Sequence, residues 1–81
     1  MLNSISIQGR LVEEPELKQT MNGVSTTSFS IATDRNYGKD KTTDFFNVVA
    51  WRNNAEFINK YFRKGQEILI TGTLQNDTWE I

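Results

Sequence analysis

The order in which strand-like and helix-like patterns follow one another is the strongest constraint on the fold of this chain. Residues 4–12 alternate between apolar and polar side chains, as in a strand with one buried face, and two further strand-like runs cover residues 24–35 and 43–52. Apolar side chains at helical spacing then predict a helix that begins at Asn53 and stops near Gly65. A fourth strand is expected over residues 66–75.

A few residues mark the boundaries of these elements. Asn22-Gly23 is a tight-turn signal before the second strand, and the polar residues 36–42 are expected to form a loop. Asn53 and Glu56 have the spacing of a capping box at the start of the helix. The buried stripe of that helix is expected to contain Ala55, Phe57, Ile58, Tyr61 and Phe62.

Three strands, a helix and a fourth strand are the element order of an OB-fold, a five-stranded Greek-key β-barrel. We therefore expect an all-β protein with one short helix between strands 3 and 4. A chain of 81 residues leaves no room for a second core, so residues 1–81 form one domain, and a domain of this size favours self-association. Six residues follow Gln75, too few for a turn and a full fifth strand, so that strand is expected to be missing or supplied by another chain.

The composition excludes several classes of function. The chain has no cysteine and no histidine, which removes disulfides, thiolate nucleophiles, most zinc sites and most general-base catalysis. We expect no cofactor, no metal and no enzymatic activity. Without a signal-peptide pattern or an apolar run of spanning length, we expect a cytoplasmic protein that does not enter a membrane. The least favoured of three functional hypotheses is magnesium-dependent phosphoryl chemistry. Its candidate ligands are the carboxylates Asp34, Asp40 and Asp44, in or beside the loop.

The third strand carries the pattern that is most informative about function. One face is an ordinary core face of Phe46, Val48 and Ala50, whereas Phe45 and Trp51 lie on the face that should meet solvent. Every base presents a π-face and every nucleotide a phosphate, so exposed aromatic rings followed by a cation such as Arg52 suit single-stranded nucleic acid. A strand with apolar residues on both faces also fits full burial or an interface between subunits.

Charge gives a divided answer. The net charge of −1 argues mildly against a nucleic-acid partner, which usually meets a basic surplus. A neutral total is nevertheless compatible with a basic groove as well as with ordinary solvated surface. Two further aromatics, Tyr37 in the polar loop and Trp79 near the C-terminus, fit either base stacking or a lid over the barrel. Positive charge gathers at Arg35, Lys39 and Lys41, and again at Arg52, Lys60, Arg63 and Lys64.

Four stretches, in order and over nearly the whole chain, resemble the bacterial and phage single-stranded DNA-binding proteins. They cover residues 5–12, residues 15–18 with the Asn22-Gly23 turn, residues 46–51 with 55–57 and 64–65, and residues 72–75. The resemblance implies an OB-fold that binds single-stranded DNA largely without sequence preference, in support of DNA replication, recombination or repair. It also implies a homo-oligomer, dimer or tetramer.

The resemblance carries the family's DNA contacts onto positions of this chain. Its stacking aromatics correspond to Tyr37, Phe45, Trp51 and Trp79. It also implies phosphate contacts from basic residues on the same surface, for which the candidates are Arg10, Lys18, Arg35 and Arg52, with Lys39 and Lys41 in the loop.

The chain departs from the family pattern in two places. Its loop over residues 37–43 is shorter than usual. The chain also stops before the family's fifth strand and the flexible acidic tail that recruits other repair and replication proteins, so partners of that tail are not expected here. Either the chain is truncated or a neighbouring chain completes the barrel, because an unpaired edge on the fourth strand favours such pairing. A protein-interaction OB module, such as a primosome or phage accessory factor, is the alternative function, with the aromatic face as its interface.

Overall fold

Six strands and one helix make up the described part of the chain. The computed structural model describes residues 4–37, 40–75 and 77–81, and it describes side chains over the same residues except 35–37, 40 and 41. The elements follow the order β1 (Ile5–Leu11), β2 (Glu16–Gln19), β3 (Ser25–Tyr37), β4 (Asp40–Trp51), α1 (Arg52–Tyr61), β5 (Glu67–Gln75) and β6 (Thr78–Glu80).

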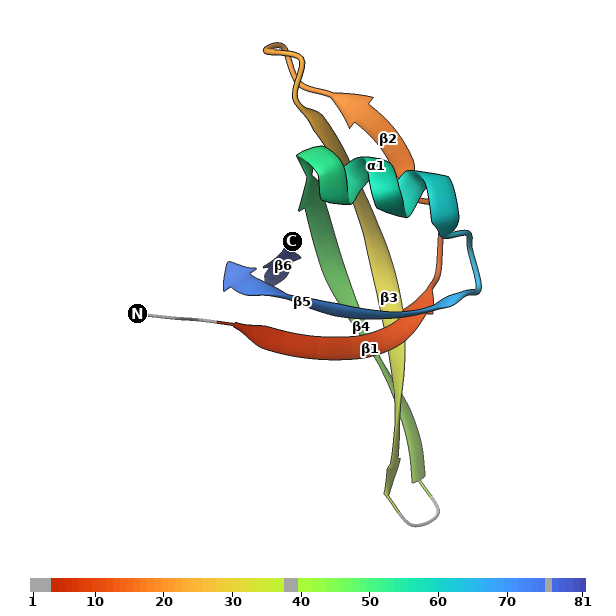
Figure 1. The fold of residues 1–81 in the computed structure, drawn as a ribbon. Coiled ribbons are helices and arrows are strands. Elements are labelled where there is room, and N and C mark those ends of the chain that lie inside the picture. The colour runs from red at the N-terminus through yellow and green to blue at the C-terminus, as the bar shows by residue number, and fades with distance from the viewer. Residues whose placement is uncertain (1–3, 38–39, 76) are drawn as a thin grey trace.

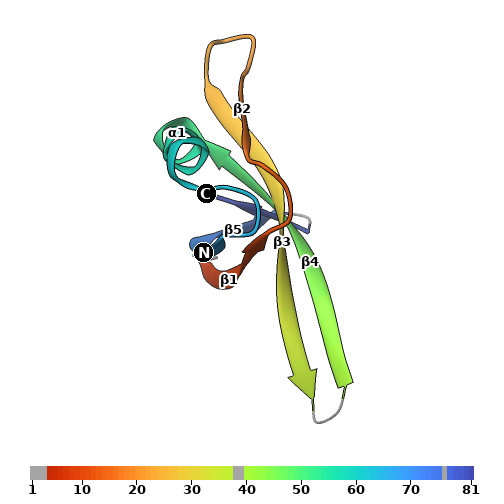
Figure 2. The same ribbon diagram turned by 90° about the vertical axis from the view of Figure 1, so that its right-hand side faces the viewer.

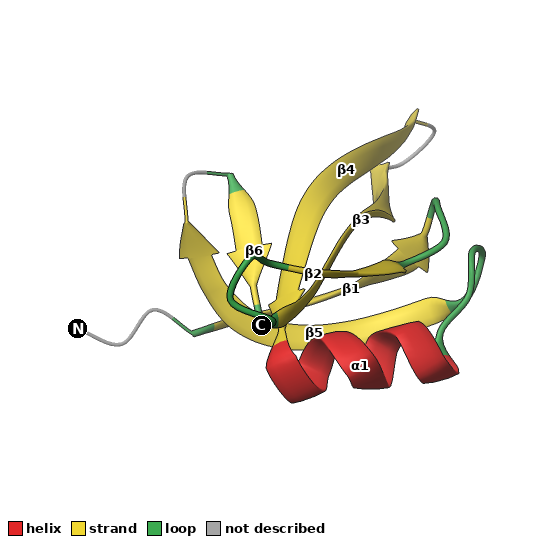
Figure 3. Ribbon diagram, turned by 90° about the horizontal axis from the view of Figure 1, so that it is seen from above, coloured by secondary structure: helices red, strands yellow, loops and turns green. Residues whose placement is uncertain are grey.

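The strands close into a barrel, as the order of elements predicts. The sheet has the order β1-β5-β6-β4-β3-β2, and an additional pairing of β1 with β3 joins its two sides. All neighbours are antiparallel except β4 and β6, which run parallel. Helix α1 lies between β4 and β5 in the chain, and β1 and β5 cross the long strands β3 and β4 (Figures 1 and 3). The expected OB-fold barrel with one helix is therefore confirmed.

The core lies inside this barrel, where alternate residues of each strand point inward. Opposite residues of β3 and β4 share a face, so Phe29 with Val48 and Ile31 with Phe46 bring apolar side chains together. Fully burying one such side chain contributes about 1.5–3 kcal/mol. The buried apolar cluster consists of Leu11, Phe29, Ile31, Val48, Ala50, Ala55, Ile58, Ile68, Ile70 and Trp79.

The chain itself supplies the strand that was expected to be missing. After a turn in which Asp77 takes a φ of 65°, β6 pairs antiparallel with the end of β5 and parallel with residues 47–49 of β4. The backbone N–H of Ile81 then donates to the carbonyl of Val49 at 2.9 Å, and the N–H of Trp51 donates to the carbonyl of Ile81 at 3.0 Å. A tight turn and three paired residues therefore suffice to close the barrel.

The central hairpin is longer than the sequence suggested. Strand β3 continues to Tyr37, and β4 already begins at Asp40. Their backbones are paired in the region where a loop over residues 36–42 was expected. In Figures 1 and 2 this hairpin projects well beyond the barrel. The short strand β2, which the sequence analysis did not anticipate, pairs with the other end of β3.

The start of α1 also differs from expectation. The N-cap residue is Trp51 in extended conformation, with no side-chain hydrogen bond to the helix, so the capping box of Asn53 and Glu56 does not form. The expected buried stripe is narrower as well. Ala55 and Ile58 are buried, but Phe57 and Tyr61 are each 56% exposed.

Gly72 allows β6 to approach β5, and its replacement tests the closure of the barrel. A Cβ at this position would overlap the carbonyl oxygen of Glu80 and the side chain of Ile81. We expect Gly72→Val to lower the free energy of unfolding by about 1–3 kcal/mol, the usual cost of overpacking. Urea unfolding followed by circular dichroism measures this change. Thr71→Ser, on the exposed side of the same strand, is the control, with an expected loss within about 0.5 kcal/mol, because it keeps the hydroxyl that hydrogen-bonds to Ser6 at 2.7 Å. Equal stability of the Gly72 variant and wild type would contradict the close approach.

Candidate nucleic-acid interface

The outer face of the β3–β4 pair carries the exposed aromatic side chains. Strand residues alternate between the two faces of a sheet, so the core residues Val48 and Ala50 put Phe45 and Trp51 on the opposite side. Phe45 is 66% exposed and Trp51 is 39% exposed. The sequence prediction that both rings face solvent is therefore confirmed, and we call this outer surface of β1, β2, β3 and β4 the aromatic face.

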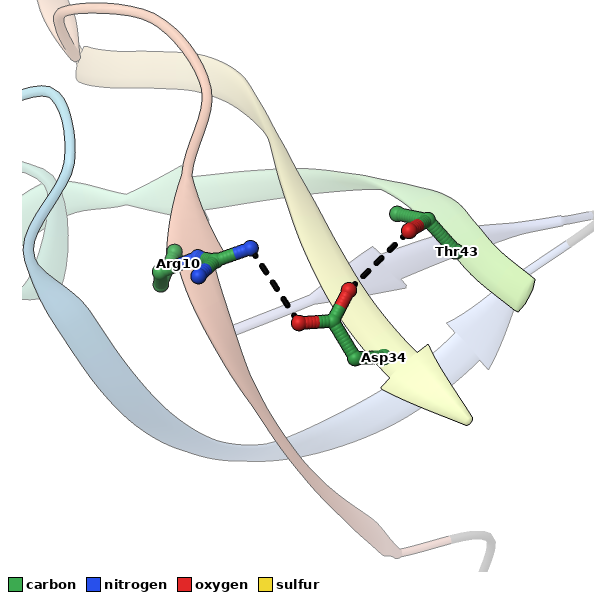
Figure 4. Close-up of polar contacts among 3 residues, drawn as sticks. All are labelled: Arg10, Asp34 and Thr43. Atoms are coloured by element: carbon green, nitrogen blue, oxygen red, sulfur yellow. Dashed lines mark hydrogen bonds and ion pairs between the residues drawn. The ribbon is translucent and has the colours of Figure 1, made fainter. Parts of the chain in front are cut away.

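One row of the aromatic face runs across three strands from a cation to an aromatic ring. Arg10 of β1 lies opposite Ala32 of β3, which lies opposite Phe45 of β4, so all three share the outer face. Arg10 forms an ion pair with Asp34, with Nη2 of Arg10 3.3 Å from Oδ2 of Asp34 (Figure 4). The hydroxyl of Thr43 donates to the other oxygen of Asp34 at 3.0 Å.

A second row repeats this arrangement at the other end of β4. Lys18 of β2 lies opposite Thr26, which lies opposite Trp51. Trp51 is the last residue of β4, and Arg52 follows with a φ of 56°, an uncommon conformation for a residue with a side chain. The exposed Arg52 therefore stands at an abrupt turn from strand to helix, directly after Trp51 in the sequence.

Between the rows, Val49 of β4 is accompanied by polar side chains. Ser30 donates from its hydroxyl to Oδ1 of Asn47 at 3.1 Å, and its backbone N–H donates to Oε1 of Glu13 at 3.0 Å. At about 3.4 Å per residue, the six positions from Phe45 to Trp51 place the two rows about 20 Å apart.

Carboxylates accompany the cations on the aromatic face. Glu16 lies opposite Ser28 on the outer side, Glu13 reaches the backbone of β3, and Asp34 binds Arg10. Among its described side chains, the face therefore has no large excess of positive charge, in keeping with the net charge of −1. Exposed aromatic rings beside paired charges, rather than a strong electrostatic field, are therefore what this face offers a ligand.

Four of the predicted contacts fall in the hairpin end. The backbones of Arg35, Tyr37 and Lys41 pair within β3 and β4, opposite Thr42, Asp40 and Asn36. Their side chains lie outside the described part of the structure. Lys39 lies outside the described residues altogether.

The structure places Trp79 in the core, which corrects the expectation that its ring is available for stacking. Trp79 is 6% exposed, because the parallel pairing of β6 with β4 turns its side chain into the barrel opposite Val48. Its ring meets Phe46 edge-on, with centroids 6.4 Å apart. Its Nε1 finds no acceptor among the described residues. A base cannot reach either face of this ring in the present arrangement.

A second exposed apolar surface was missed by the sequence analysis. Phe57 and Tyr61 of α1 contact each other with ring centroids 4.8 Å apart, and Leu69 of β5 is 68% exposed. A groove lined by Phe57, Phe62 and Leu69 lies between α1 and β5. Helical geometry could have predicted the exposure of Phe57. At 100° per residue, its side chain points 100° away from that of the buried Ile58 around the helix axis.

Of the three candidate magnesium ligands, Asp34 and Asp44 have described side chains, whereas the side chain of Asp40 lies outside the described part of the structure. No group of three or more acidic side chains that could hold a metal occurs in the described part of the chain. Asp34 is instead engaged by Arg10 and Thr43. Among the described residues, no helix has the length and apolar character needed to cross a membrane.

The closed barrel of strands with a single helix between β4 and β5 defines an OB-fold. More specifically, the chain belongs to the single-strand binding protein family, whose family model matches residues 2–81. Single-stranded DNA-binding proteins of Fusobacterium nucleatum subsp. nucleatum and Thermotoga maritima are 45% and 40% identical to it, over 98% and 96% of this chain. The matches cover 54% and 59% of those proteins, so the chain spans little more than half their length.

A solved structure is similar as well. The structure described as a Plasmodium falciparum SSB complex with ssDNA has a TM-score of 0.85 and 31% sequence identity to this chain. The similarity covers 93% of this chain and 71% of that chain.

The different burial of the two tryptophans gives a test that needs no ligand. Acrylamide should quench the fluorescence of Trp79→Phe, which retains Trp51, more strongly than that of Trp51→Phe, which retains the buried Trp79. The emission of the latter should also lie at shorter wavelength, because its indole is shielded from water. Both variants should first be shown to be folded by circular dichroism. Equal quenching of the two variants would contradict the burial of Trp79.

Proposed function

We propose that the chain is a cytoplasmic, non-catalytic protein that binds single-stranded DNA largely without sequence preference. Bases stack on Phe45 and Trp51, while Arg10, Lys18 and Arg52 contact phosphates. Such binding would support DNA replication, recombination or repair. Membership of the single-strand binding protein family and the names of the relatives support this proposal.

The observation that carries the proposal is the repeated row on the aromatic face. In each row, a small side chain separates a cation from an exposed ring, Ala32 in one and Thr26 in the other. A nucleotide needs both partners, since its base stacks and its phosphate carries charge. The adjacent hairpin end extends the same proposal to Tyr37 as a stacking residue and to Arg35, Lys39 and Lys41 as phosphate contacts.

Titration with oligo-dT tests the function directly. We expect single-stranded oligo-dT to quench Trp51, and affinity to fall as salt rises, because phosphate neutralisation releases counterions. Phe45→Ala and Trp51→Ala should each weaken binding by about 1–3 kcal/mol, the range for one base–aromatic stack. Binding of the variants is best measured by fluorescence anisotropy of labelled oligo-dT.

Two controls keep this experiment specific. Tyr61→Ala removes an aromatic ring of similar exposure from α1, outside the aromatic face, and should leave the affinity nearly unchanged. A duplex of the same length should bind more weakly than the single strand, because paired bases do not present their faces. Equal affinity for duplex and single strand would overturn the proposal.

We further propose that the protein is a homo-oligomer, dimer or tetramer, in which Leu69 and Phe57 are covered by a second copy. Their exposure supports this, since isolated domains seldom leave such large apolar side chains clustered in water. The small size of the domain also favours association. The same surface supports the second candidate function, a protein-interaction module that binds a different partner there.

The mass of two variants separates DNA binding from self-association. Leu69→Glu should shift the sedimenting species toward monomer, because a carboxylate would be buried without a partner. Trp51→Ala should keep the wild-type mass while losing affinity for oligo-dT. If Trp51→Ala dissociated the oligomer instead, the aromatic face would be a subunit interface and the protein-interaction function would be favoured.

A further inference from the structure

Asp34 forms an ion pair with Arg10, which is one of the proposed phosphate contacts. Its Oδ2 lies 3.3 Å from Nη2 of Arg10, and both side chains are about half exposed. Arg10 belongs to the same row as Phe45, so a base stacked on that ring brings its phosphate close to this cation. In the free protein, the carboxylate therefore fills one of the sites that the proposed function needs.

The carboxylate is fixed from its other side. Thr43 lies opposite Asp34 in the β3–β4 pairing and donates its hydroxyl to Oδ1 at 3.0 Å (Figure 4). This bond does not involve Arg10, so Asp34 can remain beside the site when the guanidinium turns away. A guanidinium exposed to this degree exchanges one oxyanion for another at little cost, because water screens the exposed ion pair.

We propose that Asp34 is an intramolecular competitor of DNA phosphate for Arg10. It orients Arg10 across the aromatic face in the free protein, and it weakens binding because phosphate must displace it and then tolerate its negative charge. This inference rests on the proposed function. It assigns Asp34, a residue outside the stacking and phosphate-contacting set, a role in setting affinity and salt dependence.

Salt dependence follows from counting ions. Each phosphate neutralised on a single strand contributes about 0.7 to the slope of log K against log salt. When phosphate takes Arg10 from Asp34, the released carboxylate gathers a cation from solution, which offsets the counterion released from the DNA. Removing the charge of Asp34 abolishes this offset, so the slope should become steeper.

Asp34→Asn tests the inference, since the amide oxygen can still accept the Thr43 hydrogen bond. In low salt this variant should bind oligo-dT about three- to fivefold more tightly than wild type, in line with the strength of an exposed ion pair. Its salt slope should be steeper by up to about 0.7 for each site engaged. Fluorescence anisotropy over a series of salt concentrations gives both quantities, and thermal melting verifies that the variant is folded.

Glu16→Gln is the matched control. Glu16 is exposed on the aromatic face, its substitution makes the same change in charge, and it forms no ion pair with a described residue. We expect a change in affinity below twofold and an unchanged salt slope. In an Arg10→Gln background, Asp34→Asn should likewise improve binding by less than twofold, because the guanidinium for which carboxylate and phosphate compete is absent.

The outcomes distinguish this inference from the proposed function. If Asp34→Asn matched Glu16→Gln in affinity and slope, or kept its full gain in the Arg10→Gln background, the competition would be wrong while DNA binding stood. If wild type failed to bind oligo-dT at all, the proposed function itself would be wrong. A tighter variant with a steeper slope that depends on Arg10 would establish the competition.

Discussion

The pairing of β3 with β4 is the interaction on which the rest of the molecule depends. Twelve residue pairs, from Thr26 with Trp51 to Tyr37 with Asp40, fix which side of each strand meets the core. A slip of one residue would turn Val48 and Ala50 outward and Phe45 inward, exchanging the core with the aromatic face. The slip would bury polar side chains as well, so the packing of the core and the presentation of the rings are set by one register.

Closure of the barrel connects the C-terminal strand to the same register. Strand β6 fits against β5 where Gly72 has no Cβ, and it turns Trp79 into the barrel while pairing with β4. The backbone of Ile81 then bonds to Val49 and to Trp51. The backbone of Trp51, whose ring is exposed, is therefore held by the same C-terminal segment that buries Trp79.

Local sequence patterns predicted the burial of a side chain where it depends on one strand or helix alone. They failed where burial depends on pairing with a second element. The alternation that assigned Phe46, Val48 and Ala50 to one face was sufficient because a strand has a period of two. The burial of Trp79 requires a parallel pairing between residues about thirty positions apart, which no local period records. Strand β2 is exposed throughout its four residues and has Leu17 as its one apolar residue, so no alternation marks it as a strand. Asn53 is not the N-cap, because the helix begins directly at the end of β4 with Trp51 in that position.

The balance of charge on the aromatic face gives physical meaning to the near-neutral composition. A strongly basic surface attracts phosphate at long range, but it also holds any polyanion, including duplex DNA. On this chain Asp34 neutralises Arg10, and Glu13 accepts a hydrogen bond from the backbone N–H of Ser30 between the two rows. In the proposed function, this reduction of the general electrostatic attraction makes affinity depend more on the rings of Phe45 and Trp51. Only unpaired bases can stack on those rings, so the carboxylates would favour single strands over duplex by weakening the interaction that both share.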